Sequence, residues 1–222
     1  MLDWNAIDTV LLDMDGTLLD LRFDNHFWLH HLPQRYADIH QVAHDEARAR
    51  LIARFEAERG TLNWYCLDYW ARELDVDIVA LKHEVEHLIA ERPFVRDFLT
   101  GLKRRGMRVI LITNAHRDSL NLKMTHADLT PWFDRTVSAH DFGHPKEAQA
   151  FWHALHALES FDPARTLFID DTPSVLAAAH QYGIRHLLTL LQPDSGSPMR
   201  DRETLHYPGI HHFDELLHDL HH

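Results

Sequence analysis

The sequence predicts an α/β fold: a Rossmann-like parallel sheet core of about five strands flanked by helices, with a small all-helical cap inserted after the first strand. Two observations predict it. Short apolar runs alternate with helical patterns over the second half of the chain, which is the rhythm of a parallel sheet with helices on both faces. Residues 18–93 break this rhythm, because they carry amphipathic helical patterns and no clear strand.

Short apolar runs bounded by turn residues predict the strands of the sheet. The active sites of such sheets lie beyond the carboxyl ends of their strands, so the polar residues at these ends are the first candidates for function. The runs are Asp8–Asp13, Arg108–Thr113, Arg135–Ala139, Thr166–Asp170 and Ile184–Leu190.

Helices are predicted between these runs from their start and stop signals. Pro145 and Pro173 lie where a first helical turn favours proline, and Gly106 and Gly183 lie where a helix ends. The stretch from Gln192 to Pro208 is predicted to be a loop. The expected helices of the core are Arg96–Arg105, Arg117–Ala127, Pro145–Leu158, Pro173–Tyr182 and His212–Leu220.

The chain is therefore expected to divide into a core of residues 1–17 and 94–222 and a helical cap domain of residues 18–93. Because the cap directly follows the first strand, it is expected to lie over the carboxyl ends of the strands. Its expected helices are Asn25–His31, Gln41–Arg59, Asn63–Leu74 and Ile78–Ala90.

Composition limits the class of partner. A net charge of −12 over 222 residues disfavours a nucleic-acid polymer. No apolar run of about 18 residues exists and the N-terminus has no signal-peptide pattern, so no membrane partner is expected. Cys66 is the only cysteine, which excludes an internal disulfide and a cysteine-based zinc cluster and fits a reducing cytoplasm. We expect a cytoplasmic monomer or homodimer that acts on a small phosphorylated metabolite.

The predicted strand ends carry the groups that hydrolysis of a phosphate ester needs. Asp13 is placed to attack phosphorus, and Asp15 to give a proton to the leaving alcohol and later take one from water. Carboxylates at Asp13 and at Asp170 or Asp171 are the hard oxygen ligands that Mg²⁺ prefers. The phosphoryl oxygens are expected to bind Thr113, Asn114 and Lys146.

Four ordered motifs resemble those of the haloacid dehalogenase superfamily of phosphohydrolases. They are Asp13-Met14-Asp15-Gly16-Thr17, Leu111-Ile112-Thr113-Asn114, His144-Pro145-Lys146-Glu147 and Phe168-Ile169-Asp170-Asp171-Thr172.

The resemblance implies Asp13 as the nucleophile and Asp15 as the general acid/base. It also implies that Asp13, the backbone carbonyl of Asp15 and the fourth-motif acids bind Mg²⁺. Asp171 is the first choice for direct ligation, and Asp170 can ligate through water. The acid at Asp15 points to phosphoryl transfer, since the dehalogenases of the superfamily usually lack it.

Aromatic residues of the cap suggest the substrate. Thr61–Trp70 packs two tryptophans and two tyrosines into seven positions, enough to stack a purine, although a helix core would also use such residues. Together with a second cap segment, Leu21–Trp28, and with Phe142–Glu147 and Trp152, this segment resembles the GMP/IMP-type purine 5′-nucleotidases of the superfamily. That resemblance implies hydrolysis of purine nucleoside monophosphates. The candidate substrate-binding residues are Arg22, Asn25, Asn63, Trp64 and Tyr65.

Three alternatives stay open at this point. A phosphatase of sugar phosphates or phosphoglycolate would use the same core with a different cap pocket. A mutase would need a phospho-enzyme that resists water. A regulatory module that binds nucleotides without turnover is disfavoured by the acid at Asp15. His116, Arg117 and Lys123 are expected to be solvated charges at the rim of the site.

Overall fold

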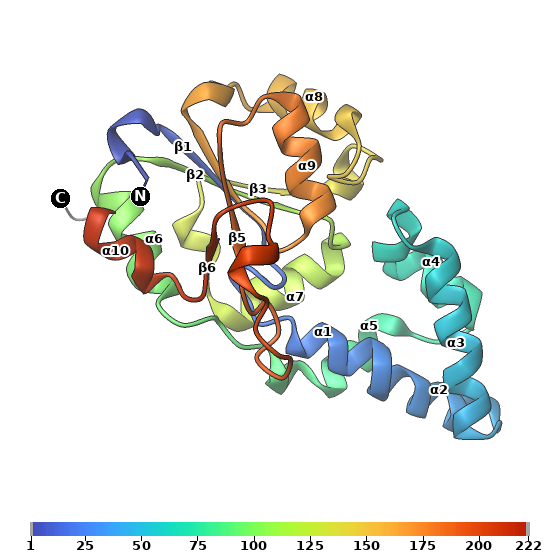
Figure 1. The fold of residues 1–222 in the computed structure, drawn as a ribbon. Coiled ribbons are helices and arrows are strands. Elements are labelled where there is room, and N and C mark those ends of the chain that lie inside the picture. Colours follow the sequence, from blue (N-terminus) through green and yellow to red (C-terminus); the bar gives the residue numbers. More distant parts are fainter. Residues whose placement is uncertain (1, 221–222) are drawn as a thin grey trace.

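The computed structural model describes residues 2–220, so the two final histidines, whose origin the sequence leaves open, lie outside it. Within these residues the core is one parallel sheet of six strands in the order β3-β2-β1-β4-β5-β6, covered by helices on both faces (Figure 1). The strands are β1 (Thr9–Leu12), β2 (Arg108–Thr113), β3 (Arg135–Ser138), β4 (Thr166–Ile169), β5 (His186–Leu190) and β6 (Gly209–Ile210).

Strand β6 was missing from the prediction. It contains only Gly209 and Ile210, and two residues are too few to show a period of two in the sequence. It pairs with β5 at the edge of the sheet, where Leu190 lies opposite Ile210. The other five strands lie within the predicted runs, each with its bounds shifted by at most two residues.

The first strand lies in the middle of the sheet and aligns the strand ends that carry the motifs. Leu12 of β1 lies opposite Leu111 of β2 and Ile169 of β4, in parallel register on both sides. The backbone N–H of Asp13 then donates to the carbonyl of Ile169 at 3.0 Å, which extends the pairing to the end of the strand. The residues that follow β1 and β4 therefore lie side by side.

Alternate residues of β1 face the two sides of the sheet, as a strand with both faces buried requires. Val10 and Leu12 pack into one apolar core, and Leu11 into the other. Helices α6 (Val95–Arg104), α7 (Arg117–Ala127) and α10 (Asp214–Leu220) contribute to the first core, and α8 (Gln149–Leu158) and α9 (Pro173–Tyr182) to the second.

Helix α8 begins later than predicted. Pro145 does not lie in its first turn, because residues 145–148 form a separate turn and the helix starts at Gln149. The hydrogen bonds of the Lys146 backbone explain this later start of α8. Its N–H donates to the side chain of Asn114 at 2.8 Å, and its carbonyl accepts from Nε1 of Trp152 at 2.8 Å, so both are used outside the helix.

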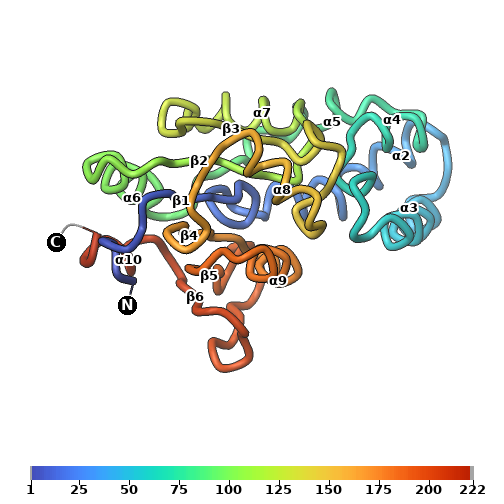
Figure 2. Tube along the Cα trace, turned by 90° about the horizontal axis from the view of Figure 1, so that it is seen from above, coloured from blue at the N-terminus to red at the C-terminus, as the bar shows by residue number. Residues whose placement is uncertain are grey.

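The chain between β1 and α6 is helical, and Figures 1 and 2 show it beyond one end of the sheet. We call residues 22–88 the helical segment. Across residues 2–220, no helix has the length and apolar composition that a membrane crossing needs. The helical segment contains α1 (Arg22–His26), a π-helical stretch (Phe27–His31), α2 (Leu32–His40), α3 (His44–Glu58), α4 (Leu67–Leu74) and α5 (Ile78–Glu84), with 3₁₀ turns at Leu62–Tyr65 and Glu86–Leu88.

The helical segment has its own apolar interior. Trp70 is buried, and its ring meets Phe55 edge-on with a centroid distance of 5.0 Å. Gln41 lies in the left-handed region at φ 55° and ends α2, which is why α3 begins at His44 and not at the predicted Gln41. Trp70 is thus a core residue, while Trp64 and Tyr65 are only partly buried.

Candidate active site

Lys146 connects two of the predicted acids at the carboxyl ends of the strands. Its ammonium donates to Oδ1 of Asp13 at 2.5 Å and to Oδ2 of Asp170 at 2.7 Å. All three side chains are buried. A buried charge is tolerated only when it is paired and hydrogen-bonded, so this arrangement fixes the position of the Asp13 carboxylate.

Burial also makes these acids hard to ionise. Removal from water raises the pKa of Asp13 to about 7 although Lys146 opposes the change, and it raises the pKa of Asp170 to about 6. The pKa of Asp171 is raised to about 7, by burial and then by repulsion from Asp13. More negative charge is therefore gathered here than Lys146 can neutralise.

The three acids have the geometry of a divalent-cation site. Asp13, Asp170 and Asp171 each place a carboxylate oxygen within 4.8 Å of the others. Their donor atoms are all hard oxygens, which suit Mg²⁺, and the raised pKa values show that a positive charge would be favourable there. The residues present thus fit the ion that the sequence predicts.

Gly16 allows the first motif to lie against Asp171. A Cβ at this position would come within 2.8 Å of the Asp171 carboxyl group, and φ is +81°, a conformation that other residues rarely adopt. Arg200 holds the other side of Asp171 by donating to its backbone carbonyl at 2.6 Å. Sequence reasoning missed Arg200 because it lies in a predicted loop with no motif.

Asn114 holds the Lys146 turn. Its side-chain Oδ1 accepts from the backbone N–H of Lys146, and its Nδ2 donates to Glu147 at 2.9 Å. We expect this side chain to donate to a phosphoryl oxygen; Nδ2 carries two N–H groups, and the contact with Glu147 uses one of them. Glu147 also accepts from the hydroxyl of Tyr65 at 3.2 Å, so it connects the core to the helical segment. Thr113 lies one residue earlier and lines the same cavity.

A second buried charge network begins at Asp15. Lys123 of α7 donates to Asp15 and to Asp24 of α1, both at 2.6 Å, and Lys82 of α5 donates to Asp24 at 3.1 Å. Burial raises the pKa of Asp15. In Asp24 burial is outweighed by Lys123 and Lys82, and the pKa is lowered. The network therefore joins a strand-end acid to two helices of the helical segment.

Two expectations about the rim were wrong. Lys123 is buried, with 1% of its surface exposed, and is not a solvated charge; the face of α7 that carries it is turned toward Asp15 and Asp24. His116 also lies inside the rim, with 14% of its side chain exposed, because it lines the cavity as the residue before α7. Amphipathic spacing could not reveal either, since both are polar residues on buried faces.

A cavity of about 260 Å³ lies above the strand ends. It brings together most of the predicted site residues. Arg22 and Asn63 do not line it, and the amide of Asn63 donates instead to Glu58 at 3.2 Å. The predicted residues that line it are Asp13, Asp15, Asn25, Trp64, Tyr65, Thr113, Asn114, Lys146 and Asp171.

An apolar recess of about 100 Å³ adjoins this cavity, and Asn25, Trp28 and Trp64 line both. Leu29, Phe55 and Trp70 complete its walls. The amide Nδ2 of Asn25 donates to the carboxylate of Asp194 at 2.6 Å, so a loop of the core holds this side chain. The site therefore has a charged end at the strand tips and an aromatic end in the helical segment.

This arrangement defines a class of protein. A buried carboxylate held by a lysine, a second acid two residues later and a set of hard oxygen ligands suit hydrolysis of a phosphoric monoester. Residues 7–183 match the model of the haloacid dehalogenase-like hydrolase family. The chain belongs to this family and is a phosphoric monoester hydrolase.

The sequence is also similar to curated relatives over nearly its full length. It is 41% identical over 217 residues to the GMP/IMP nucleotidase YrfG of Escherichia coli strain K12, which covers 98% of this chain and 97% of the relative. The protein of the same name from Shigella flexneri matches to the same extent.

Solved structures share the fold at low sequence identity. A HAD phosphatase from Thermococcus onnurineus aligns with a TM-score of 0.77 at 20% identity, over 95% of this chain and 96% of that one. A structure described as a putative β-phosphoglucomutase from Thermotoga maritima aligns with a TM-score of 0.69 at 19% identity, over 96% and 98% of the two chains. At these identities the likeness supports the fold alone.

Replacing Asp24 tests the second charge network. Asp24→Ala should lower the free energy of unfolding by about 3–5 kcal/mol, because Lys82 stays buried without its anion. Glu56→Ala is the matched control: its pair with Arg59 is exposed, so the loss should be under about 1 kcal/mol. Urea titrations of both variants measure the difference, and equal losses would contradict a structural role for the network.

Proposed function

We propose that this hydrolase removes phosphate from purine nucleoside 5′-monophosphates such as GMP and IMP, in the presence of Mg²⁺, through a phosphorylated Asp13. The observation that carries the proposal is the continuity of the two cavities: one end holds the predicted catalytic residues, and the other is an aromatic recess of the helical segment. The curated relatives named GMP/IMP nucleotidases support the same substrate class.

In the first half-reaction, Asp13 attacks the phosphorus atom and the bond to the ester oxygen breaks. Asp15 gives its proton to that oxygen, and the nucleoside leaves. In the second, Asp15 takes a proton from water, the water oxygen bonds to phosphorus, and the bond to Asp13 breaks to release phosphate. Lys146 holds Asp13 in place by its 2.5 Å hydrogen bond, and Thr113 offers a hydroxyl to the phosphoryl group.

Asp13, the backbone carbonyl of Asp15 and either Asp170 or Asp171 would hold Mg²⁺. The bound ion would supply positive charge that reduces repulsion between the carboxylate of Asp13 and the phosphate. Asp171 is the preferred direct ligand. Asp170 already accepts from Lys146 and, through its other oxygen, from the backbone N–H of Thr172 at 2.8 Å. Asp171 has no such bond to Lys146, so it retains more capacity to bind a cation.

The aromatic recess accounts for recognition of the base. Trp64 and Trp28 offer rings on which a purine can stack. Asn25 donates through Nδ2 to Asp194, which fixes the orientation of its amide and leaves Oδ1 as an acceptor. N1 of guanine and hypoxanthine carries an N–H donor, whereas N1 of adenine is an acceptor, so Oδ1 of Asn25 would favour 6-oxopurines when it lies opposite N1. Tyr65, whose hydroxyl donates to Glu147 at 3.2 Å, lines the larger cavity beside Trp64.

Residues 18–93 act in this proposal as a cap domain over a core of residues 1–17 and 94–222. The contacts between them support this role, because Asp15–Lys123–Asp24 and Glu147–Tyr65 both join the core to the helical segment. A cap of this kind excludes water from the reacting groups when it closes.

Two substitutions separate the half-reactions. Asp13→Asn should lower turnover on the order of 10⁴-fold or more, since the nucleophile is lost. Asp15→Asn should slow GMP hydrolysis by roughly 10²- to 10⁴-fold. With p-nitrophenyl phosphate, whose leaving group needs no proton, Asp15→Asn should still release about one equivalent of nitrophenol in a rapid burst.

Stopped-flow absorbance measures that burst, and circular dichroism checks that each variant is folded. A burst from Asp13→Asn, or an undiminished rate of GMP hydrolysis in Asp15→Asn, would contradict the assigned roles.

Trp64→Ala tests the stacking of the base. The loss of one stacking ring should cost about 1–3 kcal/mol, seen as a rise in KM for GMP with little change for glucose 6-phosphate. Trp132→Ala, in a 3₁₀ turn of the core away from the cavity, is the matched control. Equal changes for both substrates would indicate that Trp64 serves packing only.

The raised pKa values predict how Mg²⁺ binding depends on pH. The folded protein holds extra protons on Asp13, Asp170 and Asp171, so without metal these groups make the fold less stable as pH rises from about 4 to 7. Mg²⁺ binds their ionised forms, so it should raise Tm more at pH 8 than at pH 5.5. Thermal unfolding with and without Mg²⁺ at both pH values tests this, and a larger effect at pH 5.5 would contradict it.

A further inference from the structure

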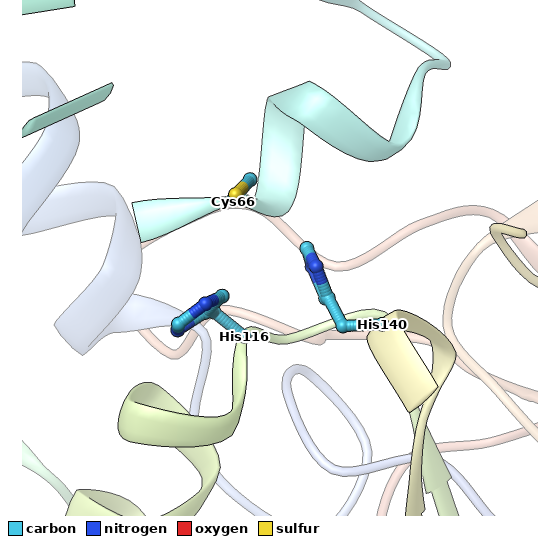
Figure 3. Close-up of side chains that lie close together, drawn as sticks. All are labelled: Cys66, His116 and His140. Carbon is cyan, nitrogen blue, oxygen red and sulfur yellow. The ribbon is translucent and has the colours of Figure 1, made fainter. Parts of the chain in front are cut away.

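Three residues with metal-binding side chains meet beside the cavity and form a cluster separate from the three acids. Figure 3 shows Cys66 of the helical segment facing His116 and His140 of the core. Each offers a ligand atom that lies within 4.8 Å of the other two. Cys66 precedes α4, His116 precedes α7, and His140 lies in the 3₁₀ turn Ala139–Asp141 after β3. Residues from three separate parts of the chain thus converge on one point.

The state of His140 suits a metal ligand. Its Nε2 is buried and has no hydrogen-bond partner in the structure, which is costly for a polar atom. The ring also has a backbone hydrogen bond to Asn114, the kind of contact that orients a metal-binding imidazole through its other nitrogen. Burial and then the neighbouring His116 lower the pKa of His140 to about 4, so the ring is neutral, the form that binds metals.

Polar neighbours also lie beside Cys66 and His116. The sulfur of Cys66 accepts from the backbone N–H of Tyr69 at 3.4 Å, which holds the sulfur at the start of α4. The carboxylate of Asp68 lies 3.6 Å from Nε2 of His116, so a fourth ligand is close by. Around a tetrahedral ion with bonds of 2.0–2.3 Å, ligand atoms lie roughly 3.3–3.8 Å apart. A contraction of at most about 1.5 Å from the separations of up to 4.8 Å would complete such a site.

We propose that Cys66, His116 and His140 form a second metal site, specific for Zn²⁺-type ions, that joins the helical segment to the core at the mouth of the cavity. One sulfur and two imidazole nitrogens are ligands for Zn²⁺ and disfavour Mg²⁺, which prefers hard oxygens. The two ions are therefore separated by donor chemistry within one protein.

The position of this site implies an inhibitory effect. His116 lines the cavity, and so do Tyr65 and Leu67 on either side of Cys66. An ion bound here would hold the helical segment against the core and slow the passage of substrate and product. This consequence rests on the proposed function, whereas the binding of the metal does not.

Cobalt absorption tests the binding directly. Co²⁺ is added to the full-length protein in excess Mg²⁺ with a phosphine reductant. We expect a thiolate-to-cobalt charge-transfer band at one equivalent that Zn²⁺ displaces. Cys66→Ser should remove the band, and His140→Ala should weaken Zn²⁺ affinity by at least about tenfold. His126→Ala, an exposed histidine on α7 outside the cluster, should change neither.

Wild-type protein that gives no thiolate band overturns the proposal, whatever the variants do. So does a Cys66→Ser variant that is folded by circular dichroism and keeps wild-type Zn²⁺ affinity.

Zn²⁺ inhibition of turnover at saturating Mg²⁺ tests the functional consequence. The inhibitory Zn²⁺ concentration should rise at least about tenfold in Cys66→Ser, with each variant compared to its own rate without Zn²⁺. Unchanged inhibition would mean that Zn²⁺ acts at the acidic site and would overturn the inhibitory role. If no ester is hydrolysed at all, the proposed function fails while the absorption experiment still decides whether the metal site exists.

Discussion

The contact of Lys146 with Asp13 and Asp170 is the interaction on which the rest of the site depends. The parallel register of β1 and β4 brings the two acids together, and their repulsion in a buried space must be offset. The turn of residues 145–148 positions Lys146, and the side chain of Asn114 holds that turn by accepting from the backbone N–H of Lys146. The late start of α8 follows from the same requirement. The local structure around three strand ends is thus arranged to place one ammonium group.

A second buried lysine pairs with two acids farther from the sheet. Lys123 lies between Asp15 and Asp24, and Lys82 completes the charge balance on the side of the helical segment. Buried ion pairs seldom add much stability over apolar packing, but they tolerate few alternative arrangements. The network therefore specifies how the helical segment meets the core, and it connects the acid at Asp15 to α1 and α5 of that segment.

Sequence reasoning predicted the parallel sheet and the gathering of acids at its edge, because strand periodicity and ordered motifs are local signals. It missed what long-range contacts decide. Strand β6 was too short to show a period, and Pro145 was assigned to a helix that begins four residues later. Lys123 was expected to be solvated, since its buried partner Asp24 lies 99 residues away in the chain. Arg22 and Asn63 were chosen by composition, and neither lines the cavity.

The release of inorganic phosphate from GMP, IMP, AMP, UMP, glucose 6-phosphate and phosphoglycolate, each with Mg²⁺ and with a chelator, decides whether the catalytic residues and the aromatic recess serve one substrate. We expect Mg²⁺-dependent turnover that favours GMP and IMP over AMP, since the strand-end acids and the aromatic recess then act on one substrate. Preference for glucose 6-phosphate or phosphoglycolate would keep the catalytic core and contradict the role given to the recess. No turnover of any ester by folded protein would contradict the catalytic roles of Asp13 and Asp15.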